Sequence, residues 1–141
     1  MSGNSRYTIA LHVLCWMTMV ARNGKDLVTS EAIAGSVNTN PVFVRRVLGS
    51  LRVAGLVESQ RGAGAGWRLA REPDQIRLDA VYEAMVDEPL FALHHGTPNQ
   101  KCPVGRGIRD ALAPVYSDAE DALKRRLSRT TIAELLHETL S

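Results

Sequence analysis

Residues 29–69 read TSEAIAGSVNTNPVFVRRVLGSLRVAGLVESQRGAGAGWRL, and this segment indicates the fold class. Its first part is typical of a short helix, because Thr29 or Ser30 can cap the first turn. A second helix begins at Asn40 and Pro41, a capping side chain followed by a residue whose missing N–H costs nothing in the first turn. Apolar residues then recur at three- and four-residue spacing. Two short helices joined by a tight turn predict a helix-turn-helix.

The outward face of the second helix is basic. Its arginines stand between the apolar positions, and polar residues form the turn before it. The planar fork of an arginine can bind a guanine edge or a phosphate, and free N–H groups at a helix start favour a phosphate oxygen. We therefore predict that this face binds double-stranded DNA, with a solvated arginine face as the alternative. The candidate contacts are Asn38, Thr39, Asn40, Arg45, Arg46 and Arg52, with Thr29 and Ser30 at the start of the first helix.

A glycine-rich hairpin is predicted directly after the second helix. Gly55 ends that helix, residues 56–60 and 67–69 favour strands, and residues 61–66 form the turn between them. Backbone without side chains can approach a duplex closely, and one basic residue at the tip can follow the phosphates or enter the minor groove. The glycine spacing fits neither a dinucleotide-binding fingerprint nor a P-loop. Further candidate DNA contacts are therefore Arg61, Gly62 and Gly64.

Several motifs in this order resemble the Rrf2 family of winged-helix transcription regulators, the group that includes IscR, NsrR and CymR. The most specific are Asn40-Pro41 with Val44-Arg45-Arg46, the junction over residues 51–57, and the glycine wing followed by Leu69-Ala70-Arg71. The resemblance extends, more weakly downstream, over nearly the whole chain. It implies a homodimeric DNA-binding regulator, commonly a repressor, that recognises a palindromic operator through two recognition helices and two wings.

Composition agrees with a small regulator and argues against an enzyme. The chain has 141 residues, 45% hydrophobic and 23% charged, which is ordinary for one globular domain. Its net charge of +2 divides into +4 over residues 1–80 and −2 over residues 81–141. No nucleophile signature or paired carboxylates suggest catalysis. Two cysteines and no bilayer-length apolar segment lead us to expect a cytoplasmic protein without membrane contact. A protein-interaction module that has lost DNA binding is a further alternative.

The expected fold class is mainly α with a small β-wing, a winged helix-turn-helix domain plus a long dimerisation helix. Residues 1–88 form the DNA-binding domain, including an N-terminal helix over residues 7–21. Residues 89–103 form a loop, and residues 104–141 form the dimerisation helix and a C-terminal helix. The long helix carries an apolar stripe that could pack on a second subunit or back onto its own core. The stripe comprises Ile108, Leu112, Val115, Ala119 and Leu123.

Two local features of the C-terminal half predict helix boundaries. Pro114 lies inside the long apolar pattern, and Ser117 with Glu120 three residues later can form a capping box. We therefore expect a kink or a restart of the helix there. Thr131 and Glu134 have the same spacing and predict the start of the last helix.

The sensing region departs from the pattern of the resembled family. The best-known members hold an iron–sulfur cluster with three cysteines, whereas residues 91–109 contain only Cys102, and Gly105 stands where a histidine is found in IscR-like sequences. We therefore expect no cofactor and no iron–sulfur cluster.

Three modes of sensing stay open. Cys102, beside Lys101 at the start of a helix, can be a redox-sensing thiol, because this setting stabilises a thiolate. A mixed metal site across a dimer could combine Cys102 with His12, His94 or His95. A partner protein or small effector without a metal is the third possibility. Cys15, on the apolar N-terminal helix, is interpreted as a packing residue.

Overall fold

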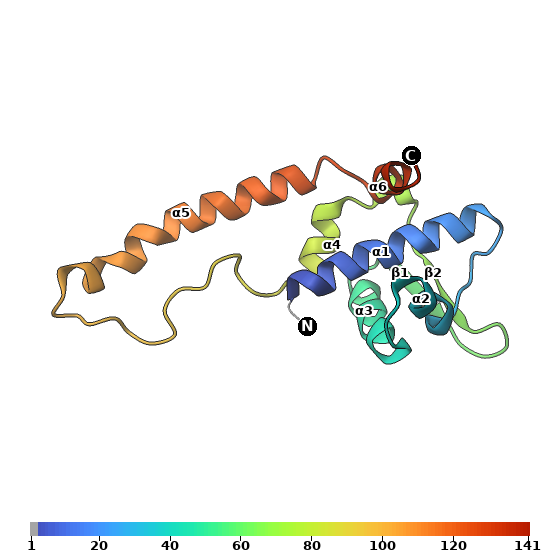
Figure 1. Cartoon of the computed structure of the whole chain (residues 1–141), viewed down its shortest axis with the longest axis horizontal. Coiled ribbons are helices and arrows are strands. Elements are labelled where there is room, and N and C mark those ends of the chain that lie inside the picture. The colour runs from blue at the N-terminus through green and yellow to red at the C-terminus, as the bar shows by residue number, and fades with distance from the viewer. Residues whose placement is uncertain (1–2) are drawn as a thin grey trace.

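The computed structural model describes residues 3–141 and is mostly helical, with one two-stranded antiparallel sheet (Figure 1). This confirms the prediction of a mainly α fold with a small β-wing. Among residues 3–141, no helix is long and apolar enough to cross a membrane. The elements in chain order are α1 (Gly3–Arg22), α2 (Ser30–Val37), α3 (Pro41–Val53), β1 (Val57–Gln60), β2 (Gly66–Leu69), the 3-10 turn η1 (Pro73–Gln75), α4 (Leu78–Met85), α5 (Pro103–Leu127) and α6 (Ile132–Thr139).

Helix α1 is the centre of the core, with α2, α3, α4, α6 and the hairpin packed around it (Figure 1). Its apolar residues recur at the spacing of one helical face, and those on that face are almost fully buried. Cys15 is 7% exposed, which confirms its packing role, and burial raises the pKa of its thiol to about 11. The buried α1 residues are Ala10, Val13, Leu14, Cys15, Met17 and Thr18.

The N-terminal end of α1 is held against α4. The helix begins at Gly3, four residues before the predicted start, because the polar residues of its first turn carry no apolar periodicity that could reveal it. The Tyr7 hydroxyl donates to the Leu78 carbonyl at 2.9 Å, and its ring meets the edge of Tyr82 with centroids 5.4 Å apart. Burial, with Asp79 nearby, raises the pKa of Tyr7 to about 12.

The C-terminal helix α6 returns to the main body. Its capping box is present as predicted, with the Thr131 side chain accepting from the Glu134 N–H. Ile132 and Leu136 are buried in the same cluster as the core of α1, and the Ile132 N–H donates to the Ile76 carbonyl at 2.8 Å. The sequence grouped this helix with the long helix, whereas in the structure its apolar face packs on α1 and η1.

Helix α5 projects away from the body with the segment 86–102 running back beside it (Figure 1). It is continuous from Pro103 to Leu127. Of the two predicted alternatives, a kink or a restart, the restart is therefore wrong: Ser117 and Glu120 lie inside the helix. Pro114 removes one helical hydrogen bond without ending the helix. None of the α5 residues is buried. At its C-terminal end α5 is tied to α4 by an ion pair between Lys124 and Glu83 at 2.9 Å.

Two glycine replacements should change stability in opposite directions. At Gly66 an added Cβ would lie 2.7 Å from the Val28 carbonyl oxygen, where Val28 and Trp67 exchange backbone hydrogen bonds. Gly66→Ala should therefore lower the free energy of unfolding by about 1–3 kcal/mol. Gly49 lies inside α3 with open space around it, so Gly49→Ala should raise that free energy by about 0.5–1 kcal/mol. Urea denaturation followed by circular dichroism measures both; an unchanged Gly66→Ala protein would contradict the close approach at the hairpin base.

Candidate nucleic-acid interface

Side-chain caps fix the two helices of the helix-turn-helix. The Thr29 hydroxyl oxygen accepts from the Ala32 N–H at 3.1 Å at the start of α2. Asn38 ends α2 in the left-handed conformation with φ 63°, which turns the chain toward α3. The side-chain Oδ1 of Asn40 then accepts from the Phe43 N–H at 2.8 Å and caps α3. These contacts confirm the predicted caps and set the angle at which α3 leaves the turn.

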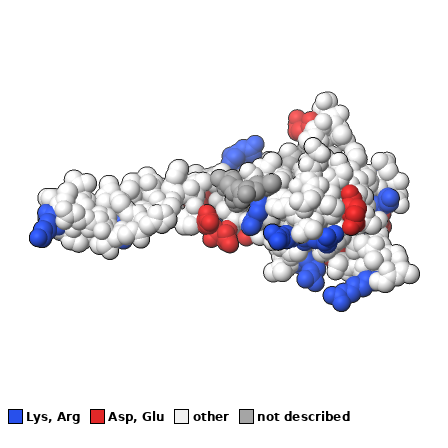
Figure 2. All heavy atoms as spheres, turned by 60° about the horizontal axis from the view of Figure 1, so that its bottom comes forward, with Lys and Arg blue, Asp and Glu red and all other residues white. Residues whose placement is uncertain are grey.

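Helix α3 has one buried face and one basic face. The apolar stripe is fully enclosed by the core, so the residues between its members must point outward. Arg45, Arg46 and Arg52 are all exposed. Figure 2, in which this side of the molecule comes forward, shows Lys and Arg side chains gathered over it. The buried residues of α3 are Val44, Val47, Leu48 and Leu51.

Arg45 is linked to α2. Its Nη1 donates to the Ser30 Oγ at 3.2 Å and to the Glu31 Oε1 at 3.4 Å. Within residues 3–141, Arg46 and Arg52 take part in no ion pair, so their guanidinium groups are available to an external anion. The three arginines of α3 therefore differ in how far they are fixed.

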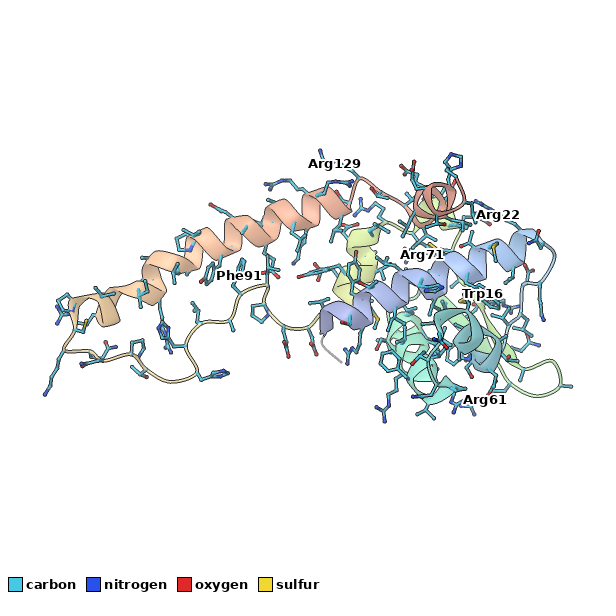
Figure 3. All side chains as sticks on the ribbon, viewed as in Figure 1. Trp16, Arg22, Arg61, Arg71, Phe91 and Arg129 are labelled. Carbon is cyan, nitrogen blue, oxygen red and sulfur yellow. The ribbon has the colours of Figure 1, made fainter. Side chains whose placement is uncertain are left out.

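The wing is the antiparallel hairpin of β1 and β2, with Val57 opposite Leu69 and Gln60 opposite Gly66. Its turn needs left-handed backbone at Gly62 and Gly64, where φ is 89° and 76°, and glycine adopts this conformation without strain. Arg61 opens the turn, is exposed, and lies on the same side of the molecule as α3 (Figure 3).

A cleft of about 380 Å³ separates the start of α2 from the wing. It is lined by Thr29 and Ser30, by Arg52 of α3, and by Arg61 and the half-buried Trp67 of the hairpin. The structure thus brings together DNA-contact candidates that lie more than thirty positions apart in the sequence. Basic side chains beside a helix start are typical of a phosphate-binding surface.

The candidate residues differ in what their side chains already do. Thr29 and Asn40 use their side-chain oxygens as helix caps. Ser30 is only 5% exposed, and its hydroxyl accepts from Arg45. Glu31 also belongs to this interface, although its position in the sequence predicts no role there. The only signal was indirect: a residue fourteen positions before Arg45 falls opposite it when two short helices join through a tight turn.

The predicted dimer stripe lies along α5 and is incompletely covered. Ile108, Leu112, Ala119 and Leu123 are half-buried, and Val115 is 59% exposed. The loop before α5 is fastened to the same helix, because Arg109 Nη2 donates to the carbonyl oxygens of His94 and Gly96. Phe91 of this loop packs on Tyr116 with ring centroids 5.0 Å apart.

The sensor candidates do not converge on a metal site. Cys102 is exposed at the N-cap of α5, and His94 and His95 are exposed in the loop. The His12 Nε2 is hydrogen-bonded to the Ser36 hydroxyl at 3.0 Å, which gives this ring a structural partner. Across residues 3–141, no three histidine, cysteine or acidic side chains are grouped as a metal ion requires.

The position of the family's histidine is closed to any side chain. A Cβ at Gly105 would collide with the Asn99 carbonyl oxygen, so the loop is packed directly against the first turn of α5. The Arg106 Nη1 donates to the Gln100 carbonyl at 3.3 Å and adds a further tie. One thiol with this loop packing does not fit an iron–sulfur cluster.

The chain is similar to known transcriptional regulators. The Rrf2 family model, described as an iron-dependent transcriptional regulator, matches residues 4–138. YwnA of Bacillus subtilis (strain 168), assigned by name to the HTH-type transcriptional regulators, is 37% identical over 135 residues, which are 95% of this chain and 96% of YwnA. IscR of Cereibacter sphaeroides is 32% identical over 96 residues, 68% of this chain and 60% of that protein.

Solved structures show the same fold. A protein whose title assigns it to the DNA-binding proteins is 32% identical, with a TM-score of 0.72 over 93% of this chain and 98% of its own. CymR (YrzC), titled the global cysteine regulator of B. subtilis, is 22% identical, with a TM-score of 0.67 over 98% of this chain and 96% of its own.

The relatives and the family are regulators and not enzymes, in agreement with the lack of a catalytic signature in the sequence. The iron in the family description finds no fitting ligand set among the described residues of this chain. The capped helix-turn-helix and the glycine-rich wing agree with the family match, which covers almost the entire chain. The chain belongs to the Rrf2 family of transcriptional regulators.

Proposed function

We propose that the protein is a homodimeric repressor that binds a palindromic operator, with α3 in the major groove and the wing at the adjacent minor groove. The observation that carries this proposal is the position of Arg61 on the same side as the basic face of α3. An α-helix is narrow enough to enter a major groove, and the arginines of α3 point outward from it. The glycine turn lets the Arg61 backbone approach the phosphates closely.

Helix α5 supports the homodimer. It has 25 residues, none of them buried, and its apolar stripe is only partly covered by its own chain. An apolar stripe of this length requires a partner surface. The α5 helix of a second copy offers the same stripe, related by a two-fold rotation. A two-fold axis at this contact would present two copies of α3 to the DNA, and the operator would share that symmetry.

Exposure of Cys102 favours thiol control of the same assembly in the cytoplasm. Its side chain is free at the first turn of α5, the helix that we assign to the dimer contact. With peroxide as oxidant, the Cys102 thiolate attacks one oxygen, the O–O bond breaks, a sulfenic acid forms and hydroxide leaves. Sensing by an effector that needs no metal stays the alternative, while a mixed Cys/His site would need ligands from both copies.

Removal of the two central arginines of α3 should abolish operator binding. In Arg45→Ala plus Arg46→Ala, each lost base contact should cost about 1–3 kcal/mol, and each lost phosphate contact should reduce the salt slope by about 0.9. Fluorescence anisotropy on a duplex selected from genomic fragments, at several salt concentrations, measures both quantities.

The matched control removes the same charge elsewhere. Arg22 and Arg129 lie on the side of the molecule away from α3 (Figure 3), so Arg22→Ala plus Arg129→Ala should keep operator affinity within about twofold. If both double variants lost the same operator affinity, the assignment of α3 would be wrong, because the loss would then follow from net charge alone.

Charges placed on the α5 stripe should dissociate the dimer. Leu112→Glu plus Val115→Glu would bury two unpaired carboxylates at the proposed contact, and this should raise the dimer dissociation constant at least about 100-fold. Sedimentation velocity should show a dimer for the wild type and a monomer for the variant. Asp118→Asn plus Asp121→Asn, at exposed positions beside the stripe, is the control that should stay dimeric.

The two cysteines should react at different rates. Cys102 is exposed, whereas Cys15 is buried with its thiol pKa raised to about 11, so a disulfide reagent should label one thiol per chain quickly and the other only in denaturant. Cys102→Ser should keep operator affinity and lose the change that peroxide causes in the wild type. A wild type whose DNA affinity ignores peroxide would exclude redox control at this thiol.

A further inference from the structure

One acidic side chain lies within the proposed DNA-binding face. Glu31, in the first turn of α2, is bound to Arg45 of α3 at 3.4 Å and also lines the cleft that holds Arg52 and Arg61. Its side chain is 67% exposed and that of Arg45 is 47% exposed. An ion pair this exposed contributes little to folding stability. A carboxylate here also repels the phosphates of an approaching duplex, so it lowers the affinity of this face for DNA of any sequence that offers only phosphates.

The contacts to Arg45 all fall on one nitrogen. Nη1 donates to the Glu31 Oε1 and to the Ser30 Oγ, while Nε and Nη2 have no partner among the described residues. Nε and Nη2 form one two-pronged edge of the guanidinium, which matches O6 and N7 of guanine. The pairing therefore fixes one side of the group and leaves the reading edge open.

The Ser30 and Glu31 side chains that hold Arg45 are themselves fixed in place. Ser30 is 5% exposed and its hydroxyl lies 3.5 Å from the Glu31 Oε2, so serine and glutamate form one unit at the start of α2. Thr29 caps this turn through the Ala32 N–H. The Arg45 guanidinium is thus held by α2 rather than by its own helix, and its position follows the angle between α2 and α3.

We propose that Glu31 is a specificity-determining residue: it positions Arg45 to read a guanine in the major groove and prevents that arginine from binding phosphates indiscriminately. The inference rests on the proposed DNA-binding function of α3. Arg45 reads the base, and Glu31 acts through it as a positioning residue. Glu31 lowers affinity for unrelated DNA and raises the preference for a duplex that offers guanine to the open edge of Arg45.

Two substitutions separate the effect of the Glu31 charge from the effect of its side-chain length. Glu31→Gln removes the negative charge, and Glu31→Asp keeps the charge on a shorter side chain that cannot maintain the 3.4 Å contact. Glu83→Gln is the matched control, because Glu83 is also an exposed carboxylate in an ion pair but lies on α4 beside α5. Each protein is titrated by anisotropy against the selected duplex, its single-base-pair variants and an unrelated duplex, at several salt concentrations.

We expect Glu31→Gln to bind the unrelated duplex at least about threefold more tightly and with a salt slope steeper by about 0.9. Its preference for guanine at one base pair of each half-site should fall about tenfold. Glu31→Asp should lose the same preference for guanine, but its affinity for the unrelated duplex should not increase. In an Arg45→Ala background, Glu31→Gln should change base preference no more than Glu83→Gln does.

The outcomes distinguish this inference from the function on which it rests. Wild-type protein that binds no duplex, or binds all with equal affinity, overturns both. Wild-type protein that is selective, with Glu31→Gln equally selective, overturns the role of Glu31 alone. If both Glu31 variants change only the midpoint of thermal unfolding, Glu31 serves the dipole of α2 and the inference is wrong.

Discussion

Burial of four apolar side chains on α3 orients the basic face of this helix. Val44, Val47, Leu48 and Leu51 are almost fully enclosed, and together they leave α3 one orientation against α1. Because residues on a helix are separated by 100° steps, burying this stripe turns Arg45, Arg46 and Arg52 outward. The basic face is thus a consequence of packing on the opposite side, and loss of core volume would move the arginines as well as reduce stability.

Local signals made the helix-turn-helix and the wing predictable. Asn40 and Pro41 allow few positions for a helix start, and the glycines after Arg61 allow few conformations other than a turn. The same logic found the capping box at Thr131. Each of these features depends on residues within a few positions of one another, so a single sequence contains the information needed.

Features that depend on distant residues were not predictable. Ser117 and Glu120 have capping-box spacing, but a helix already running past Pro114 has no free N–H groups there for a cap to satisfy. The return of α6 to α1 depends on backbone bonds from Ile132 to Ile76 and from Leu78 to Thr130, over fifty positions apart. Apolar spacing shows that α6 has a buried face but does not name the surface that covers it.

Ion pairing divides the arginines of the interface into two kinds, and the net charge conceals this division. Arg45 is paired with Glu31 and hydrogen-bonded to Ser30. Arg46, Arg52 and Arg61, by contrast, have no ionic partner among residues 3–141. An unpaired arginine keeps its rotamer freedom and adapts to phosphates, which carry no base identity. A supported arginine has lost part of that freedom before DNA arrives, so less entropy is lost when it meets a base edge. In the proposed function, the +4 charge of residues 1–80 attracts DNA, while Glu31 favours discrimination between sequences.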